Sequence, residues 1–558
     1  MRFSRVTKSV AVLGLAALAA CGGGGGGTAA FVPGNGGQRP DGSPILARIV
    51  GVGDSLTAGY QADGFLGATN LKNPINPGTF VRPTQQSGWW TLLYEQASGL
   101  PLDTIIADMY DPAKSPLPLI QAPGLDNQIV LAGSSQVATF GQFKGTDPCT
   151  FDSSFNLAGF RLRPSARVRM NPTATTIRNV GVPGLTMHEA ITIHLPPTDT
   201  CKPLPGIPGL LSDVVQEESG TYWPVLRNFV NLGGHLTEVN AAASLHPTLA
   251  TYWLGANDIL KYMGSGGRFV GGNRTPGQAE SDLRRAVATL EGAGAKVVVA
   301  NLPDILETGY FQRAAGPKNI NGNACKIHSY ALCLFYDLGG MPLNTAELYA
   351  KKYGLLTPNG CVPASTTAPC GYLTLPATLA ISQAFLVNPF GPMLNLNCMV
   401  PAPHCKPTNG LGANYITPAF AAKIQTLNNA INQGIDDGAS ASHVPLVDVH
   451  AIFHGLASGN PANPYFQLAT SINPGVCCTL GYIHAPPPPS FLAVPGGILS
   501  LDGIHPSNTG YALVANAFID TINKAYGTRI PEVDIKAVYH GTRCSNKKFC
   551  FPDPYAPH

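Results

Sequence analysis

Charge is what this sequence has least of. Only 12% of its 558 residues are charged, and the formal net charge is +3. Arg2, Arg5 and Lys8 account for those three charges, and residues 1–20 contain no acid, so a chain that has lost them is neutral. A neutral chain lacks the basic surface that nucleic-acid binding requires. Low charge combined with 63 glycines and 50 prolines suits a secreted protein with long ordered loops.

Residues 1–20 have the features of an export signal, but their apolar run is too short to cross a bilayer. The run ends in Leu-Ala-Ala-Cys at 18–21, which resembles the lipobox of bacterial lipoproteins. The resemblance implies that Cys21 carries lipid and anchors the protein to a membrane. Gly22, in place of an aspartate, implies the outer membrane. An ordinary signal peptide beside a cysteine is the alternative. The glycine-rich stretch 21–43 predicts a flexible tether.

The cysteines lack the CxxC pairs that are typical of structural metal sites. Setting the lipid-bearing cysteine aside leaves twelve of thirteen, and an even number in an exported chain predicts disulfides. Cys398, His404 and Cys405 are an alternative metal-binding group, disfavoured because no CxxC pair supports it. All twelve cysteines fall outside the predicted strands, so we expect the bridges to stabilise surface insertions. Cys544 and Cys550 are spaced to close a small loop.

Five apolar segments have the pattern of buried strands, and helical segments separate most of them. They cover residues 45–52, 175–180, 249–254, 296–301 and 444–449. No internal repeat is apparent, and this alternation predicts an α/β fold of three layers with a parallel sheet. The predicted domain spans 44–527, with insertions at about 66–174, 196–235, 307–414 and 455–497 and a C-terminal tail at 528–558.

Three helix starts can be predicted from their capping residues. Thr275 precedes Pro276 and stands three residues before Gln278, which is a capping-box pattern. Thr417 also precedes a proline, and Ser507 is expected to cap the last long helix.

The first predicted strand, 45–52, leads into the stretch around which the rest of the chain is organised. Both faces of this strand are apolar, and Gly53 permits a sharp exit from it. Ser55 then falls where a helix would begin, at the carboxyl end of a strand, where open α/β sheets bind ligands. We expect Asp54 to act structurally at the helix start. The alternative is that Asp54 or Ser55 does no more than cap the helix.

A serine that hydrolyses an ester needs an imidazole to take its proton, an acid to hold that imidazole, and N–H donors for the oxyanion. Asp502 and His505 stand three residues apart on one turn-like segment. This spacing lets the carboxylate reach Nδ1 while Nε2 faces Ser55. An isolated Asp-x-x-His is otherwise a capped helix start. The absence of G-x-S-x-G around Ser55 disfavours the α/β-hydrolase fold.

Four sequence blocks together resemble the SGNH, or GDSL, hydrolases, and they occur in the order of that family. They are Gly-Asp-Ser-Leu at 53–56, the block 179–184, Gly-Ala-Asn-Asp at 255–258 and Asp-Gly-Ile-His-Pro at 502–506. The resemblance implies a flavodoxin-like sheet with the active site at the carboxyl ends of its strands. It covers less than half of the mature chain.

The same resemblance implies a role for each matching residue. Ser55 would be the nucleophile, His505 the general base and then acid, and Asp502 the group that orients His505. The oxyanion would be held by the backbone N–H groups of Ser55 and Gly184 and by the side-chain amide of Asn257. A glycine lets backbone approach a substrate closely, and an asparagine side chain supplies an uncharged donor.

The predicted function is therefore an exported serine ester hydrolase that needs no cofactor and no metal. Its partners would be a lipid or other acyl ester and, through Cys21, a membrane. The apolar stretches 204–215 and 375–396 are candidates for an acyl site, or ordinary small cores under long loops. Two alternatives stay open, a carbohydrate O-acetyl esterase and a non-catalytic surface binding protein on the same scaffold.

Overall fold

The structure is a computed structural model. It describes residues 43–61, 66–67, 82–83, 85–111, 113–121, 168–169, 174–192, 225–264, 266–267, 269–313, 364–374, 394–395, 400–401, 415–457, 462, 482–484, 494–495, 498–500, 503–545 and 550–553. All of them fall in the larger of the two units into which the chain divides, 38–558. Several predicted features lie outside the described residues: the signal and tether with Cys21, the group Cys398, His404 and Cys405, the stretch 204–215, nearly all of 375–396, and Asp502.

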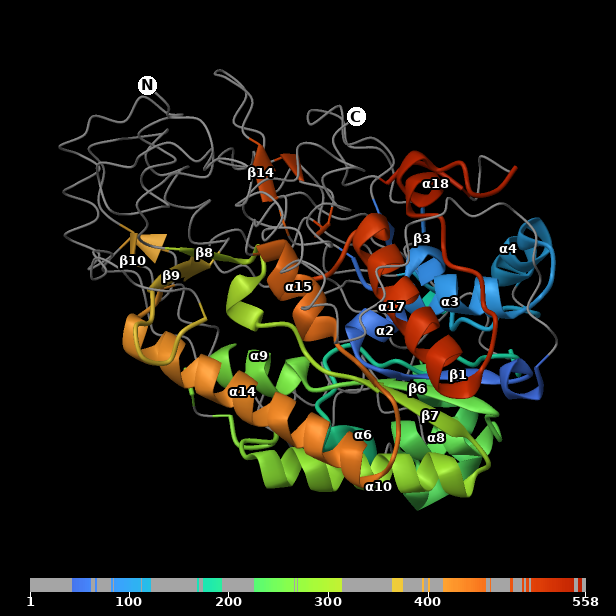
Figure 1. Ribbon diagram of the computed structural model, residues 1–558, viewed down its shortest axis with the longest axis horizontal. Coiled ribbons are helices and arrows are strands. Elements are labelled where there is room, and N and C mark those ends of the chain that lie inside the picture. Colours follow the sequence, from blue (N-terminus) through green and yellow to red (C-terminus); the bar gives the residue numbers. More distant parts are fainter. Residues whose placement is uncertain are drawn as a thin grey trace, which may run out of the picture. The chain divides into compact units, whose positions relative to one another are not determined.

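Four strands form a parallel sheet in the described chain. They are β1 (Ile49–Gly53), β6 (Leu249–Trp253), β7 (Lys296–Ala300) and β13 (Leu446–Val447), in the order β1-β6-β7-β13. Figure 1 shows the first three side by side. Every residue of β1 and β6 is buried, as is every residue of β7 after Lys296. Burial on both faces explains why these segments read as continuous apolar runs. The predicted α/β class with a parallel sheet is confirmed.

Two of the predicted strands are shorter than expected. The segment predicted to begin at residue 45 first forms a 3-10 turn, η1 (Pro44–Leu46), so that β1 begins only at Ile49. Pro44 favours this turn because its ring fixes φ at a helical value. The strand predicted at 444–449 is reduced to the two residues of β13, because helix α15 (Val449–Ala457) starts directly after it.

The segment predicted as the second strand pairs with β1 through a single parallel bridge, between Gly51 and Asn179. Gly51 N donates to Arg178 O, and Val180 N donates to Gly51 O, each at 2.9 Å. Counted with this segment, the sheet has the chain order 2-1-3-4-5. That is the order of the flavodoxin-like doubly wound sheets, which bind ligands at the switch point between the first and third strands. Here that point lies between β1 and β6.

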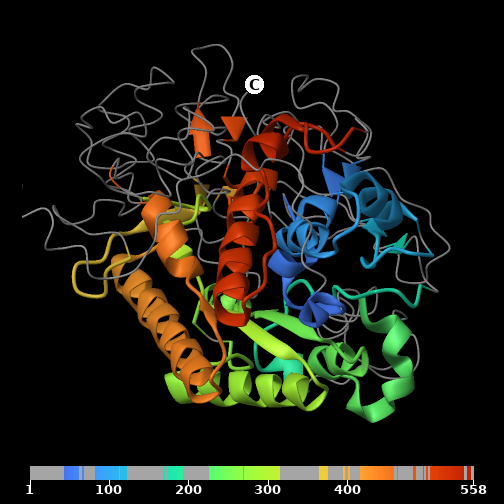
Figure 2. The same ribbon diagram turned by 45° about the vertical axis from the view of Figure 1, so that its right-hand side comes forward.

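Helices cover both faces of the sheet. On one face lie α3 (Trp89–Ala97) and α17 (Asn508–Tyr526), where Trp89 stacks on Phe518 with 4.0 Å between ring centroids. The other face carries α8 (Glu238–Ser244), α10 (Pro276–Gly292) and α14 (Pro418–Ala441). Figures 1 and 2 both show the sheet between α17 and α10. The large aromatic side chains of the core are thus concentrated where α3, α17 and β6 meet.

Helices α10 and α14 pack against each other closely enough to require a glycine. A Cβ at Gly434 would lie 2.3 Å from the carbonyl oxygen of Pro276 and 2.7 Å from the Cβ of Ala279. Both contacts are too short for any side chain, so Gly434 sets the distance between the helices.

The three predicted helix starts are confirmed. Thr275 and Gln278 form the reciprocal capping box at the start of α10. The side chain of Thr417 accepts from Phe420 N, and that of Ser507 accepts from Gly510 N. Each cap supplies an acceptor to a backbone N–H that has no partner inside the helix.

The segment predicted as a C-terminal tail is instead part of the core in its described residues. Apolar residues of 530–539, among them those of α18 (Ile535–His540), join the main hydrophobic cluster. Asp553 is buried and accepts from both N and Oγ1 of Thr509, in the first turn of α17. Arg543 forms a buried ion pair with Glu95 of α3. We call residues 528–553 the C-terminal segment.

Disulfides are described in two places. Cys544 and Cys550 are joined, as predicted, and they pack against Ile106 of the helix α4 (Leu102–Tyr110). Cys370, within the predicted insertion 307–414, is also disulfide-bonded. The first of these bridges stabilises the C-terminal segment and so supports the core, which was not expected.

The other elements are short. The helices are α2 (Ser55–Ala58), η2 (Gln85–Ser87), α6 (Glu189–Thr192), η3 (Arg227–His235), α9 (Ala256–Gly264) and η4 (Ile305–Glu307). The strands form antiparallel sets: β2 (Leu66–Gly67) with β3 (Arg82–Pro83), β4 (Ile120–Gln121) with β5 (Val168–Arg169), β10 (Leu394–Asn395) with β11 (Val400–Pro401), β14 (Tyr482–His484) with β15 (Val494–Pro495), and β9 (Tyr372–Thr374) between β8 (Phe311–Arg313) and β12 (Tyr415–Ile416). Among the described helices none is long and apolar enough to span a membrane.

Candidate active site

Ser55 is the first residue of the short helix α2, directly beyond the carboxyl end of β1. The residue is largely buried, with 9% of its surface exposed. The turn that presents it depends on Gly53, because a Cβ there would lie 2.0 Å from Thr57 Oγ1 and 2.8 Å from Trp253 O. The sequence therefore delivers a serine hydroxyl to the switch point of the sheet.

His505 faces this serine. Its Nε2 lies 2.8 Å from Ser55 Oγ, across 450 positions of sequence. The contact has the geometry of a nucleophile paired with its general base. Nε2 can accept the serine proton only if Nδ1 carries the ring hydrogen. The third predicted member of the triad, Asp502, lies outside the described residues.

The loop that carries His505 is a tight turn. Ser500 N donates to His505 O at 2.8 Å, and Gly503 N donates to Ser500 O at 3.0 Å. Gly503 has φ +71° and touches the backbone at Tyr310, whose N donates to Gly503 O at 2.9 Å. The ring of Tyr60 lies 5.0 Å from the imidazole, centroid to centroid. These contacts position His505 from several sides.

Gly184 lies on the loop that follows the second segment of the sheet. Its φ of +83° is one that glycine adopts without strain, and a Cβ there would meet nothing within 4 Å. Asn179 holds this loop beside α2, since its Nδ2 donates to Thr57 O at 2.7 Å and its Oδ1 accepts from Gly181 N at 3.0 Å. Backbone at Gly184 is thus free of crowding on the side where a side chain would lie.

The side-chain amide of Asn257, predicted as an oxyanion donor, already donates to other groups in this structure. Its Nδ2 donates to Asp54 Oδ2 at 3.0 Å and to Leu185 O at 3.1 Å, so both hydrogens of the amide have acceptors. Donation to an oxyanion would replace or share one of these two bonds. Asn257 is 9% exposed, at the start of α9. It ties together the residue before Ser55 and the residue after Gly184.

Asp54 caps α2, as predicted, because its Oδ1 accepts from Leu56 N at 2.9 Å. Its other oxygen accepts from Asn257. Burial raises the pKa of Asp54 to about 6, despite the hydrogen bond from Leu56 N and the nearby His505. Both carboxylate oxygens of Asp54 are thus occupied, one by a backbone N–H and the other by the Asn257 amide. Asp54 influences the site by holding these two groups in place.

Two buried acids that support the site were missed in the sequence. Asp258 accepts from Met187 N at 3.0 Å and from Asn273 N at 2.6 Å, and burial raises its pKa to about 7. It belongs to the Gly-Ala-Asn-Asp block, so its position was visible although its role was not. Glu238 accepts from Gly53 N at 2.7 Å, and burial raises its pKa well above the usual range. No local motif marks Glu238, because its partner lies 185 residues away.

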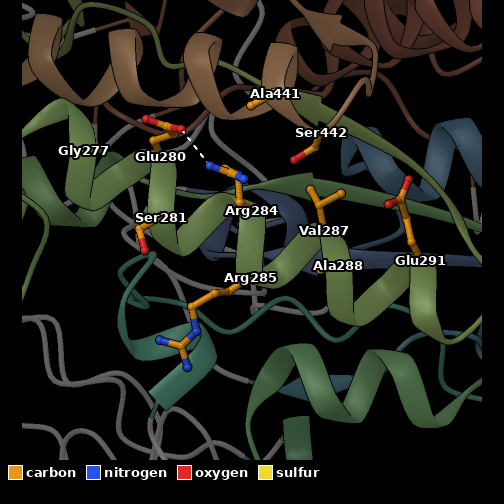
Figure 3. Close-up of a pocket in the computed structure, with 10 residues that line it drawn as sticks. All are labelled: Gly277, Glu280, Ser281, Arg284, Arg285, Val287, Ala288, Glu291, Ala441 and Ser442. Atoms are coloured by element: carbon orange, nitrogen blue, oxygen red, sulfur yellow. Dashed lines mark hydrogen bonds and ion pairs between the residues drawn. The ribbon is translucent and has the colours of Figure 1, made fainter.

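A pocket on the described surface lies elsewhere (Figure 3). It follows α10 and the end of α14, and charged side chains line it, with Arg284 Nη1 paired to Glu280 Oε1 at 3.2 Å. It shares no residue with the surroundings of Ser55 and offers no nucleophile–base pair, so we give it no role.

A comparison of the chain with models of known families, with curated proteins and with solved structures finds no match. The site therefore has to be interpreted from its own geometry.

Proposed function

We propose that this protein is a serine ester hydrolase of the SGNH type, with Ser55 as nucleophile and His505 as general base. The proposal is carried by one observation, the 2.8 Å contact between His505 Nε2 and Ser55 Oγ. Two further features support it. The pair lies beyond the carboxyl end of β1, at the switch point where sheets of this order bind ligands. The loops of Gly184 and Asn257 also converge there, through the bonds to Leu185 and Asp54.

In the proposed reaction Ser55 Oγ attacks the ester carbonyl carbon while His505 Nε2 takes the serine proton. The alcohol then leaves with that proton, and an acyl group stays on Ser55. Water attacks this acyl-enzyme with His505 again as base, which releases the acid and restores the serine. Asp502 is proposed to hold Nδ1 and to stabilise the imidazolium. The N–H groups of Ser55 and Gly184 and the Asn257 amide are proposed to bind the oxyanion.

The proposed substrate class is a lipid or other acyl ester, and the proposed location is the outer membrane, with lipid on Cys21. Mass spectrometry of protein expressed with its signal tests the anchor. A lipid-modified N-terminal Cys21 is expected. An unmodified N-terminus beginning elsewhere would contradict the anchor without affecting the proposed chemistry.

The chemistry is tested with a fluorophosphonate probe, which reacts only with an activated serine. We expect stoichiometric labelling of the wild type at Ser55, competition by p-nitrophenyl esters, and no labelling of Ser55→Ala. Ser98→Ala is the matched control, because Ser98 lies at the end of α3 and bonds only backbone groups. A wild type that is neither labelled nor active on esters from acetate to palmitate would favour the non-catalytic alternative.

A further inference from the structure

Two acids and two histidines face one another where β7 and β13 end. Asp304 and Glu307 belong to the turn around η4, and His450 and His454 stand one helical turn apart on α15. His450 Nε2 lies 3.1 Å from Asp304 Oδ2, and His454 Nδ1 lies 3.0 and 3.1 Å from the two Glu307 oxygens. The imidazole rings are nearly parallel, 5.8 Å apart. Ligand atoms of both kinds therefore converge at the carboxyl edge of the sheet.

Three of these side chains are close enough to share an ion. One ligand atom each from Asp304, Glu307 and His454 lie within 4.8 Å of one another. Zinc binds imidazole nitrogen and carboxylate oxygen at about 2.0–2.2 Å. The three atoms would have to draw closer together to reach that geometry, with solvent completing the coordination.

Asp304 is fixed in place from behind. Its Oδ1 accepts from Gln425 Nε2 at 2.6 Å and from Asn428 Nδ2 at 3.1 Å, both on α14. The other oxygen, Oδ2, faces His450. In metal sites the ligating carboxylates are held by such outer hydrogen bonds. The two amide donors thus fix the orientation of the Asp304 carboxylate.

The cluster has a buried floor and an open rim. The side chains of Asp304 and Glu307 are 6% and 7% exposed, whereas that of His454 is 56% exposed. Two carboxylates held together out of water repel each other, and a cation that enters from the histidine side relieves this repulsion.

We propose that Asp304, Glu307 and His454 bind a divalent transition-metal ion of the zinc class, with His450 positioning Asp304. An imidazole with two carboxylates suits zinc, cobalt or nickel, while calcium and magnesium take all-oxygen sites. The site is separate from Ser55 and does not depend on esterase activity. It reaches the catalytic loop through the backbone, because Tyr310, three residues beyond Glu307, donates to Gly503.

The test uses the tagless full chain, dialysed against a chelator and then titrated with Zn²⁺ by calorimetry. We expect one saturable site and a melting temperature that climbs by about 1–2 °C for each tenfold rise in free zinc. Mg²⁺ and Ca²⁺ should have no effect. Co²⁺ should give weak visible bands without the intense ultraviolet bands of cobalt–thiolate bonds, which excludes binding by cysteines.

Variants locate the site. His454→Ala and the isosteric Glu307→Gln should each abolish the saturable binding. His450→Ala should weaken it about 10- to 100-fold, as loss of an outer-shell partner does. His188→Ala is the matched control, because His188 Nδ1 also lies 3.0 Å from a carboxylate, that of Asp282, but this pair belongs to no group of three potential ligands in the described chain.

Three results would overturn the proposal. One is a wild type with no saturable zinc binding below 100-fold the concentration of protein. Another is wild-type affinity in both Glu307→Gln and His454→Ala, provided that circular dichroism shows them folded. The last is a His454→Ala protein with a lower melting temperature than the wild type, combined with a wild type whose melting temperature does not respond to zinc. That result would mean that the four side chains form only stabilising ion pairs.

Discussion

Two histidines at the carboxyl edge of the same sheet have opposite surroundings. His505 faces a hydroxyl at 2.8 Å, whereas His454 faces both oxygens of a carboxylate at 3.0 and 3.1 Å. Around Ser55 the buried acids Asp54 and Asp258 bond to backbone and amide N–H groups. Around His454 the buried acids bond to imidazoles, and Asp304 also accepts from two side-chain amides. We call these the serine site and the acid–histidine site.

The difference shows what each imidazole is suited for. A general base must be able to lose its proton near neutral pH, so a directly bonded acid on its reactive nitrogen would work against it. At the serine site the carboxylates of Asp54 and Asp258 accept hydrogen bonds from loop N–H groups. Nε2 of His505 faces the Ser55 hydroxyl instead of an acid. At the acid–histidine site two carboxylates and two imidazoles lie together, and this set of groups suits a cation. Partners, more than the residue type, decide the chemistry.

The largest effect is expected from replacing the proposed nucleophile of the serine site. Ser55→Ala should lower kcat for an activated ester by about 10⁴- to 10⁶-fold, because no acyl-enzyme can form. Its melting temperature should stay close to that of the wild type. Steady-state hydrolysis of p-nitrophenyl esters measures this, with Ser98→Ala as control. Full activity in a folded Ser55→Ala protein would show that the nucleophile lies elsewhere.

Next comes Asn257→Ala, which sharpens the comparison because Asn257 links an acid to the oxyanion loop. If the amide moves onto the oxyanion in the transition state, kcat should fall about 10²- to 10³-fold with little change in KM. A purely structural role predicts a lower melting temperature and a much smaller loss of kcat. Measuring kcat, KM and the melting curve on the same preparation separates the two roles.

Gly184→Ala should have a smaller effect, and Gly294→Ala is its control. Both glycines have positive φ, +83° and +98°, and a Cβ at either would meet nothing within 4 Å. Each alanine should therefore cost about 1–2 kcal/mol of stability through backbone strain alone. Only Gly184→Ala should also lower kcat/KM, by about 10- to 100-fold, because it would displace a proposed oxyanion donor. Equal activities in the two variants would remove Gly184 from the oxyanion site.

The smallest effect concerns pH. Burial raises the pKa of Asp258 from its ordinary value of 3.8 to about 7 in the folded protein. The folded state therefore binds the proton more tightly, so this contribution to stability is complete below pH 4 and is lost as the pH rises through 7. Asp258→Asn cannot ionise and should show a flatter melting temperature between pH 5 and 8, by a few degrees. An unchanged pH dependence in the variant would mean that Asp258 is already charged.

Much of the serine site could be predicted because its signals are local. Residues 49–53 are apolar on both faces, Gly53 and Asp54 mark the turn, and the caps at Thr275 and Thr417 follow rules that act within four residues. The segment 175–180 shows the limit of such signals. Its composition fits a strand, yet only Asn179 pairs with β1, since the extent of pairing depends on the neighbouring chain.

The missed features all depend on distant partners. His450 and His454 have the spacing of two ligands on one helical turn. The acids they face, Asp304 and Glu307, lie 146 and 147 positions earlier in the sequence. The C-terminal segment, predicted as a tail, is another such feature. Arg543 of this segment pairs in the core with Glu95, which lies 448 positions away, so no local pattern indicated the contact. The bonds of Asn257 to Asp54 and Leu185 were equally beyond local patterns.

The ion pair between Arg543 and Glu95 has a consequence for the order in which the protein folds. Burial raises the pKa of Glu95 to about 7 even with the arginine in place, so the acid is poorly accommodated until its partner arrives. That partner lies 448 positions further along the chain. The α3 face of the sheet is therefore completed only after the chain has been made at least as far as Arg543. Contacts of such long range make folding slow, because a large loop must close before they form.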